Sequence, residues 1–158
     1  MSNKILSQET HYVPGLDPVA DAFAGTVYSD VVDLGNAHAV TFVIIKGVGA
    51  TGTSTVTVEA CDDIVPTTTS AVAFAYRKMT TTDTWGANTW VASTGFVTTA
   101  GSSQRYLVHV DADMLANSGY RYVRLAMVES VDSPVLGGID IILHNLRYPR
   151  AIQTSQID

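Results

Sequence analysis

Apolar and polar side chains alternate with a period of two along most of the chain after residue 26. Thr53–Cys61 is the clearest segment, with Val56, Val58 and Ala60 on one face and Thr55, Thr57 and Glu59 on the other. Gln104–Asp111 alternates in the same way, with Tyr106, Val108 and Val110 opposed to Arg105, Leu107 and His109. Successive side chains of a strand point to opposite faces, so both segments predict half-buried β-strands.

Further strands are expected between clear turn signals. Ala39–Lys46 is a nearly continuous apolar run, which is typical of a strand buried on both faces. The other expected strands are Val27–Leu34, Ala71–Met79, Tyr120–Val131 and Ile139–Leu146. We expect one short helix over Asp111–Gly119, with Asp111 as its cap and Gly119 in a left-handed conformation after it. The pattern predicts an all-β protein, a β-sandwich or jelly roll of about seven or eight strands with one short helix.

The first 25 residues differ from the rest. Pro14-Gly15 and Pro18 are strong breakers of regular structure, and Asp17–Phe23 could form at most a helical turn or two. The segment nevertheless carries large apolar side chains, namely Tyr12, Val13, Leu16, Val19 and Phe23. We therefore expect an irregular N-terminal arm that docks in a groove, and we predict that these five residues bind a partner rather than their own domain.

This pattern divides the chain into three parts. Residues 1–25 are the predicted docking arm, 26–148 the β-sandwich domain and 149–158 a polar C-terminal tail. A chain of 158 residues has the length of one domain, and it can bury enough surface to fold without a disulfide or a metal.

Composition narrows the classes of partner. Charged residues make up 15% of the chain and the formal net charge is −6, so a phosphate backbone is not an expected partner. A surface poor in charge and rich in Thr suits a protein packed against other subunits, and it equally suits an ordinary β-sandwich. We expect self-association and no contact with nucleic acid.

Cysteine and the N-terminal residues indicate where the protein is made. Cys61 is the single cysteine, so no internal disulfide can form, which fits folding in a reducing cytoplasm. Met1–Leu6 lacks the apolar core of a signal peptide, and no apolar run approaches membrane-spanning length. We expect synthesis in the cytoplasm and no membrane partner.

Residue types that carry chemistry are present, but their spacing does not indicate a site. The four histidines lie on separate segments, and Asp62-Asp63 fits a turn better than a calcium loop. Gly47–Gly52 resembles a nucleotide-binding loop only superficially, because no helix follows it. Cys61 lies within a predicted strand, which indicates an inert side chain. We predict no catalytic residues, no metal and no cofactor, so that the protein is not an enzyme.

Aromatic residues gather in one long segment after the Ala71–Met79 strand. Trp85, Trp90 and Phe96 lie in it, and Tyr76 lies on the strand before it. Three interpretations are open for Trp85 and Trp90: packing in the core, anchoring of an interface, or stacking against sugar rings in a carbohydrate-binding module.

Three stretches of the sequence resemble the decoration (cement) proteins of tailed-phage capsids. They are Pro18–Thr26 in the arm, Ala39–Asp63 (AVTFVIIKGVGATGTSTVTVEACDD) and Ser133–Gly138 near the C-terminus. The likeness is one of pattern over most of the chain, without a sharp motif. It implies a β-rich structural protein of the virion, located on the outer capsid surface, often as a homotrimer that clamps subunits of the major capsid protein. A head, neck or tail protein of the same particle is the alternative, beside the carbohydrate-binding module.

Overall fold

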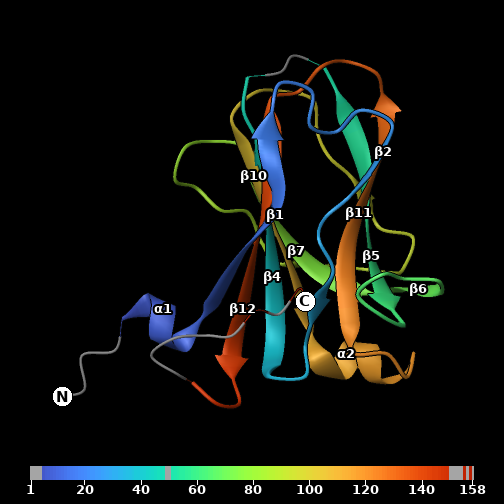
Figure 1. Ribbon diagram of the computed structural model, residues 1–158. Coiled ribbons are helices and arrows are strands. Elements are labelled where there is room, and N and C mark those ends of the chain that lie inside the picture. The colour runs from blue at the N-terminus through green and yellow to red at the C-terminus, as the bar shows by residue number, and fades with distance from the viewer. Residues whose placement is uncertain (1–4, 49–50, 150–154, 156, 158) are drawn as a thin grey trace.

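Two antiparallel β-sheets pack face to face in the computed structural model (Figure 1), which describes residues 5–48, 51–149, 155 and 157. The first sheet has the order β1-β12-β4-β10-β7-β8, and the second has the order β2-β11-β5-β6, with β3 paired to β11 and β9 paired to β5. The predicted all-β sandwich is confirmed. It has more and shorter strands than expected, because the predicted strands Val27–Leu34 and Ala71–Met79 each divide in two and further strands form in the arm and in the segments that carry Trp90 and Phe96.

The strands of the first sheet are β1 (His11–Val19), β12 (Gly137–Leu146), β4 (Ala37–Lys46), β10 (Gln104–Asp111), β7 (Phe74–Met79) and β8 (Thr89–Val91). Those of the second are β2 (Thr26–Tyr28), β3 (Val32–Asp33), β11 (Tyr122–Val131), β5 (Thr53–Cys61), β6 (Thr69–Val72) and β9 (Phe96–Val97). Two helices complete the described part, α1 (Leu6–Glu9) and α2 (Ala112–Ala116). None of the helices in that part is long and apolar enough to cross a membrane.

The core lies between the sheets and follows the period of two. Val56, Val58 and Ala60 of β5 are buried while Thr55, Thr57 and Glu59 face outward, as predicted. Tyr106, Val108 and Val110 of β10 are buried in the same way. β4 differs from its prediction: Val40, Phe42 and Ile44 are buried, but Thr41, Val43 and Ile45 are only half-buried on the outer face. A strand covered on one side is the rule in antiparallel sandwiches.

One predicted strand is divided because the chain changes its hydrogen-bonding partner. The predicted strand Ala71–Met79 pairs first with β5 in the second sheet, as β6, and then with β10 in the first sheet, as β7. The change occurs at Ala73, between the two elements. This crossing brings an edge of each sheet to one corner of the sandwich.

The arm is not irregular, which corrects the prediction. Its residues from His11 to Val19 form β1, an edge strand that pairs antiparallel with β12 (for example His11 with Leu143). The register shifts near Pro14 and again before Val19, and proline is tolerated in sheets at edges and irregularities of this kind. The turn after Val19 is not helical either. The predicted C-terminal tail lies mostly outside the described residues.

The short helix is confirmed over Ala112–Ala116, but not its cap. Asp111 has the extended backbone of a cap residue and makes no side-chain capping bond, because its carboxylate is hydrogen-bonded to His109 instead. Gly119 has φ of +75°, the left-handed conformation expected of it.

A buried lysine holds two loops together at the end of the sandwich opposite α2. The side chain of Lys46 is 1% exposed, and its Nζ donates to the carbonyl oxygens of Gly52 (2.9 Å) and Thr99 (2.8 Å). Burial lowers the pKa of this amine. Lys46 therefore connects the turn between β4 and β5 to the segment after β9.

Candidate functional site

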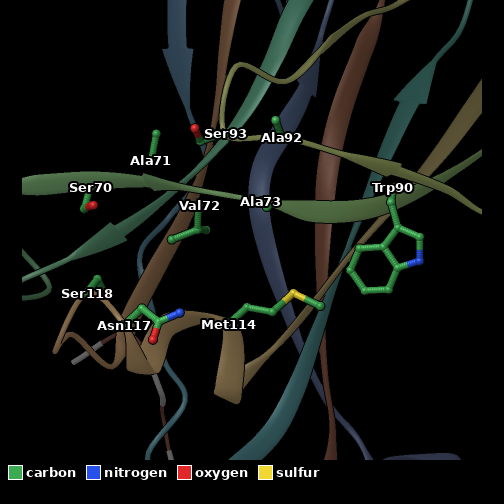
Figure 2. Close-up of a pocket in the computed structure, with 10 residues that line it drawn as sticks. All are labelled: Ser70, Ala71, Val72, Ala73, Trp90, Ala92, Ser93, Met114, Asn117 and Ser118. Carbon is green, nitrogen blue, oxygen red and sulfur yellow. The ribbon is translucent and has the colours of Figure 1, made fainter.

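A cleft of about 520 Å³ opens at the corner where the chain crosses between the sheets. The β6–β7 segment runs across it, with the chain after β8 on one side and α2 on the other (Figure 2). Ten residues line the cleft: Ser70, Ala71, Val72, Ala73, Trp90, Ala92, Ser93, Met114, Asn117 and Ser118. Its volume lies in the range of small-molecule sites, roughly 300–1,000 Å³.

Trp90 supplies the largest apolar surface of the cleft. It lies on β8 opposite Ala75 of β7, and 65% of its surface is exposed. The thioether of Met114 points toward its indole ring (Figure 2), and sulfur–aromatic neighbours of this kind are favourable. Much of the indole therefore faces solvent.

The remaining lining is small or polar and carries no charge among the described residues. Ala71, Ala73 and Ala92 leave room above the β6–β7 segment. Ser70, Ser93 and Asn117 are exposed hydroxyl and amide groups. Ser118 is held in place, because its hydroxyl donates to the carbonyl of Leu115 (2.6 Å) and accepts from the amide of Tyr120 (3.2 Å).

The other aromatic residues do not join Trp90. Phe96 is buried and stacks on Tyr76, with ring centroids 3.8 Å apart, so core packing is the right interpretation for Phe96. Trp85 is half-buried in the loop between β7 and β8 and does not line the cleft. The structure thus separates the two tryptophans that the sequence grouped together.

The five arm residues also divide, which corrects the prediction that all would serve a partner. Val13 and Phe23 are each 3% exposed and belong to the hydrophobic core of the sandwich, because pairing of β1 with β12 turns Val13 inward beside Ile141. Leu16 is partly buried against that core. Tyr12 and Val19 are 58% and 50% exposed. The arm therefore docks on the sandwich of its own chain.

Two of the four histidines meet across β4, which spacing along the chain did not reveal. His109 of β10 and His144 of β12 flank Thr41, whose hydroxyl lies 3.3 Å from Nδ1 of His109 and 3.0 Å from Nε2 of His144. Nε2 of His109 lies 3.1 Å from the Asp111 carboxylate. The strand register explains this meeting. Thr41 of β4 pairs with His109 of β10 on one side, and on the other side His144 of β12 pairs with Ala39, two residues before Thr41.

The remaining chemical candidates have structural roles. The carboxylate of Asp62 accepts hydrogen bonds from the Thr67 hydroxyl and from the amides of Thr67 (3.0 Å) and Thr68 (3.1 Å). These turn contacts, the hydroxyl contact foremost, lower the pKa of Asp62. Cys61 is buried, and desolvation raises its thiol pKa to about 11. Within the described ranges, no group of three or more His, Cys, Asp or Glu side chains has the geometry to hold a metal ion.

Comparisons with known proteins give a distant structural likeness. No family model matches the sequence, and no curated protein matches it. Among solved structures, the chain is similar to the SPBc2 prophage-derived protein YomS. The two are 12% identical, the match covers 85% of this chain and 92% of that one, and the TM-score is 0.46. A likeness at this level assigns neither a family nor a function.

Proposed function

We propose that the protein is a non-enzymatic structural component of a tailed-phage virion that decorates the outer capsid and clamps subunits of the major capsid protein. The observation that carries the proposal is a group of exposed apolar side chains at one end of a rigid sandwich. The resemblance of three sequence stretches to capsid decoration proteins supports the same role.

The exposed group, here called the tip patch, consists of Val19, Val48 and Leu136. Val19 pairs with Gly137, the residue after Leu136, and the amide of Gly47 donates to the carbonyl of Leu136 at 2.7 Å. Three separate segments therefore meet at this end, where β1 ends in Figure 1. Each side chain is at least 45% exposed.

Burial of the tip patch by a partner would be favourable. A large aliphatic side chain gains roughly 1.5–3 kcal/mol when it moves fully from water into an apolar contact. Backbone hydrogen bonds join the segments that carry the patch, since the amide of Gly47 donates to the carbonyl of Leu136 and the amide of Ala22 donates to that of Val135 (3.0 Å). A pre-ordered surface loses little conformational entropy on binding. The proposed clamp therefore uses the tip patch, with Tyr12 on the outer side of β1 as a further contact.

Attachment to shells tests the proposal. A Val19→Ser/Leu136→Ser double variant should bind undecorated shells of the phage that encodes the chain at least about tenfold more weakly in co-sedimentation. Val65→Ser is the matched control, because Val65 is 76% exposed and lies in the loop after β5. Equal binding of the double variant and the unmodified protein would contradict a role for the tip patch. Binding to tails in place of shells would contradict the capsid location.

Self-association is the second part of the proposal. The resemblance implies a homotrimer, and a chain in which 15% of the residues are charged has a surface that suits packing against other subunits. The outer face of the second sheet offers Thr55 and Thr57 beside Val128, which is 47% exposed. Light scattering over a range of protein concentrations should give three times the monomer mass. A monomer mass at all concentrations in solution, together with single copies on the shell, would contradict self-association.

A further inference from the structure

We infer that the Trp90 cleft is a binding site for a neutral carbohydrate, with the indole of Trp90 stacked against the apolar face of a sugar ring. This site lies on β8 and α2, away from the tip patch, and it does not depend on attachment to a capsid.

The exposed indole defines the first requirement for a ligand. A side chain as large as tryptophan is rarely left 65% exposed beside a concave surface. Trp90 lies on β8, which is paired with β7, and Met114 points toward its ring (Figure 2), so a paired strand presents the indole to a ligand with a flat apolar surface. A pyranose ring presents such a surface through its C–H groups, and aromatic residues suit contacts that join an apolar face to a polar edge.

The polar groups that line the rest of the cleft define the second requirement. Ser93 and Asn117 offer a hydroxyl and an amide, which both donate and accept hydrogen bonds. An aliphatic side chain that covered these groups would leave them without partners, at a cost of about 1–3 kcal/mol for each one buried. A sugar covers the indole with carbon and meets the polar groups with its own hydroxyls. This favours a carbohydrate over an apolar peptide.

Charge defines the third requirement. The described lining residues carry no charged group, and the chain as a whole has a net charge of −6. An anionic ligand such as a nucleotide, a phosphate or an acidic sugar would find no cation in the cleft and would be repelled by the protein at longer range. The ligand class that fits is therefore a neutral oligosaccharide.

The two tryptophans provide an internal test. Trp85 does not line the cleft, so a Trp85→Phe variant leaves Trp90 as the only indole in the chain. Its fluorescence should change in a saturable way on titration with at least one of maltotriose, cellotriose, chitotriose and mannotriose. Glucuronate oligomers and adenosine monophosphate serve as anionic probes and should give no saturable change.

Variants and calorimetry complete the experiment. Trp90→Ala should weaken binding of the neutral probe at least about tenfold. Asn117→Ala, tested separately, should weaken it about threefold, whereas Trp85→Ala should leave it unchanged. Trp90 and Asn117 are exposed, so their replacement should leave the fold intact, and circular dichroism of each variant checks this. The inference is overturned if calorimetry detects no binding of any neutral probe to the unmodified protein. It is also overturned if Trp90→Ala binds a neutral probe as tightly as the unmodified protein does, or if an anionic probe binds the unmodified protein more tightly than the neutral probes do.

Discussion

The imidazole rings of His109 and His144 stack with their centroids 5.4 Å apart on the outer face of the first sheet. The Thr41 hydroxyl between them can donate one hydrogen bond and accept another. When both rings are neutral, His109 donates from Nε2 to Asp111 and accepts from Thr41 at Nδ1, and Thr41 accepts from His144. A proton added to either ring places a positive charge beside the other.

Acidification should therefore destabilise the fold through His144. Burial, and then the neighbouring His109, lowers the pKa of His144 below 6.5, while Asp111 opposes this shift. A group whose folded pKa is depressed in this way contributes full stability above its unfolded pKa. That contribution is lost as the pH falls from about 6.5 through the lower folded pKa. Melting temperatures measured between about pH 7.5 and about pH 5 should decline.

A His144→Gln variant should show a shallower decline over the same interval, and His38→Gln, at an exposed position, should behave as the unmodified protein. Some dependence will persist in His144→Gln, because burial also lowers the pKa of His11. Identical profiles for His144→Gln and the unmodified protein would show that the stacked pair does not govern the decline.

Replacement of Lys46 by Met should lower the stability of the protein. Met fills a similar volume but leaves the carbonyls of Gly52 and Thr99 without their donor, at about 1–3 kcal/mol for a buried polar group left unpaired. Removal of a buried cation offsets part of this loss. Denaturant unfolding measures the difference, with Lys78→Met at an exposed lysine as the control. An unchanged midpoint for Lys46→Met would contradict the tie between the two loops.

The arm should prove necessary for the isolated fold. Phe23→Ala removes a ring that is 3% exposed, and truncations of this kind cost about 3–5 kcal/mol. Val19→Ala, at a half-exposed neighbour on the same segment, should change stability by less than about 0.5 kcal/mol. Thermal unfolding compares the two. A similar small effect for both would mean that the arm contributes little to the core.

Gly95→Ala should disrupt the pairing of β9 with β5. Gly95 has φ of +76°, and a Cβ atom at this position would overlap the carbonyl oxygen of Val56. Strain and overlap together should cost more than about 2 kcal/mol. Gly25→Ala is the matched control, because φ there is +64° but no atom lies within 4 Å of the added methyl. Equal melting temperatures of the two variants would argue against the close approach.

Cys61 should react with thiol reagents only when the protein unfolds. Its side chain is buried and its pKa is raised to about 11, so almost no thiolate is available at neutral pH. The labelling rate measured by mass spectrometry should rise in parallel with unfolding as denaturant is added. Rapid labelling of the native protein would contradict the burial of this strand.

Local pattern predicted the strands well where one face is buried and the other exposed. β5 and β10 follow the alternation of their side chains residue by residue, because each has the core on one side. The sequence could not show that the chain would change sheets at Ala73, since side-chain pattern does not encode which edge a strand pairs with. The apolar residues before and after Ala73 fit either sheet equally.

The arm and the cleft illustrate two further limits. Pro14 and Pro18 argued against a regular element, but a proline costs little at the outer edge of a sheet, and Val13 and Phe23 on either side of them reach the core. Trp85 and Trp90 are five residues apart and looked equivalent. Their difference arises from the cleft, which Trp90 lines together with Met114 of α2 and Asn117 after it, from a distant part of the chain.

The pairing of β1 with β12 has a consequence for how the protein is made. The ribosome synthesises β1 before β4, β10 and β11 and synthesises β12 after them, so β1 has no partner until all of these strands have emerged. Long-range pairings of this kind form late and slow the folding reaction. Until then Val13 and Phe23 are exposed on the nascent chain. The finished sandwich, with its tip patch in place, therefore exists only after synthesis of β12, and we expect assembly with any partner to begin after that point.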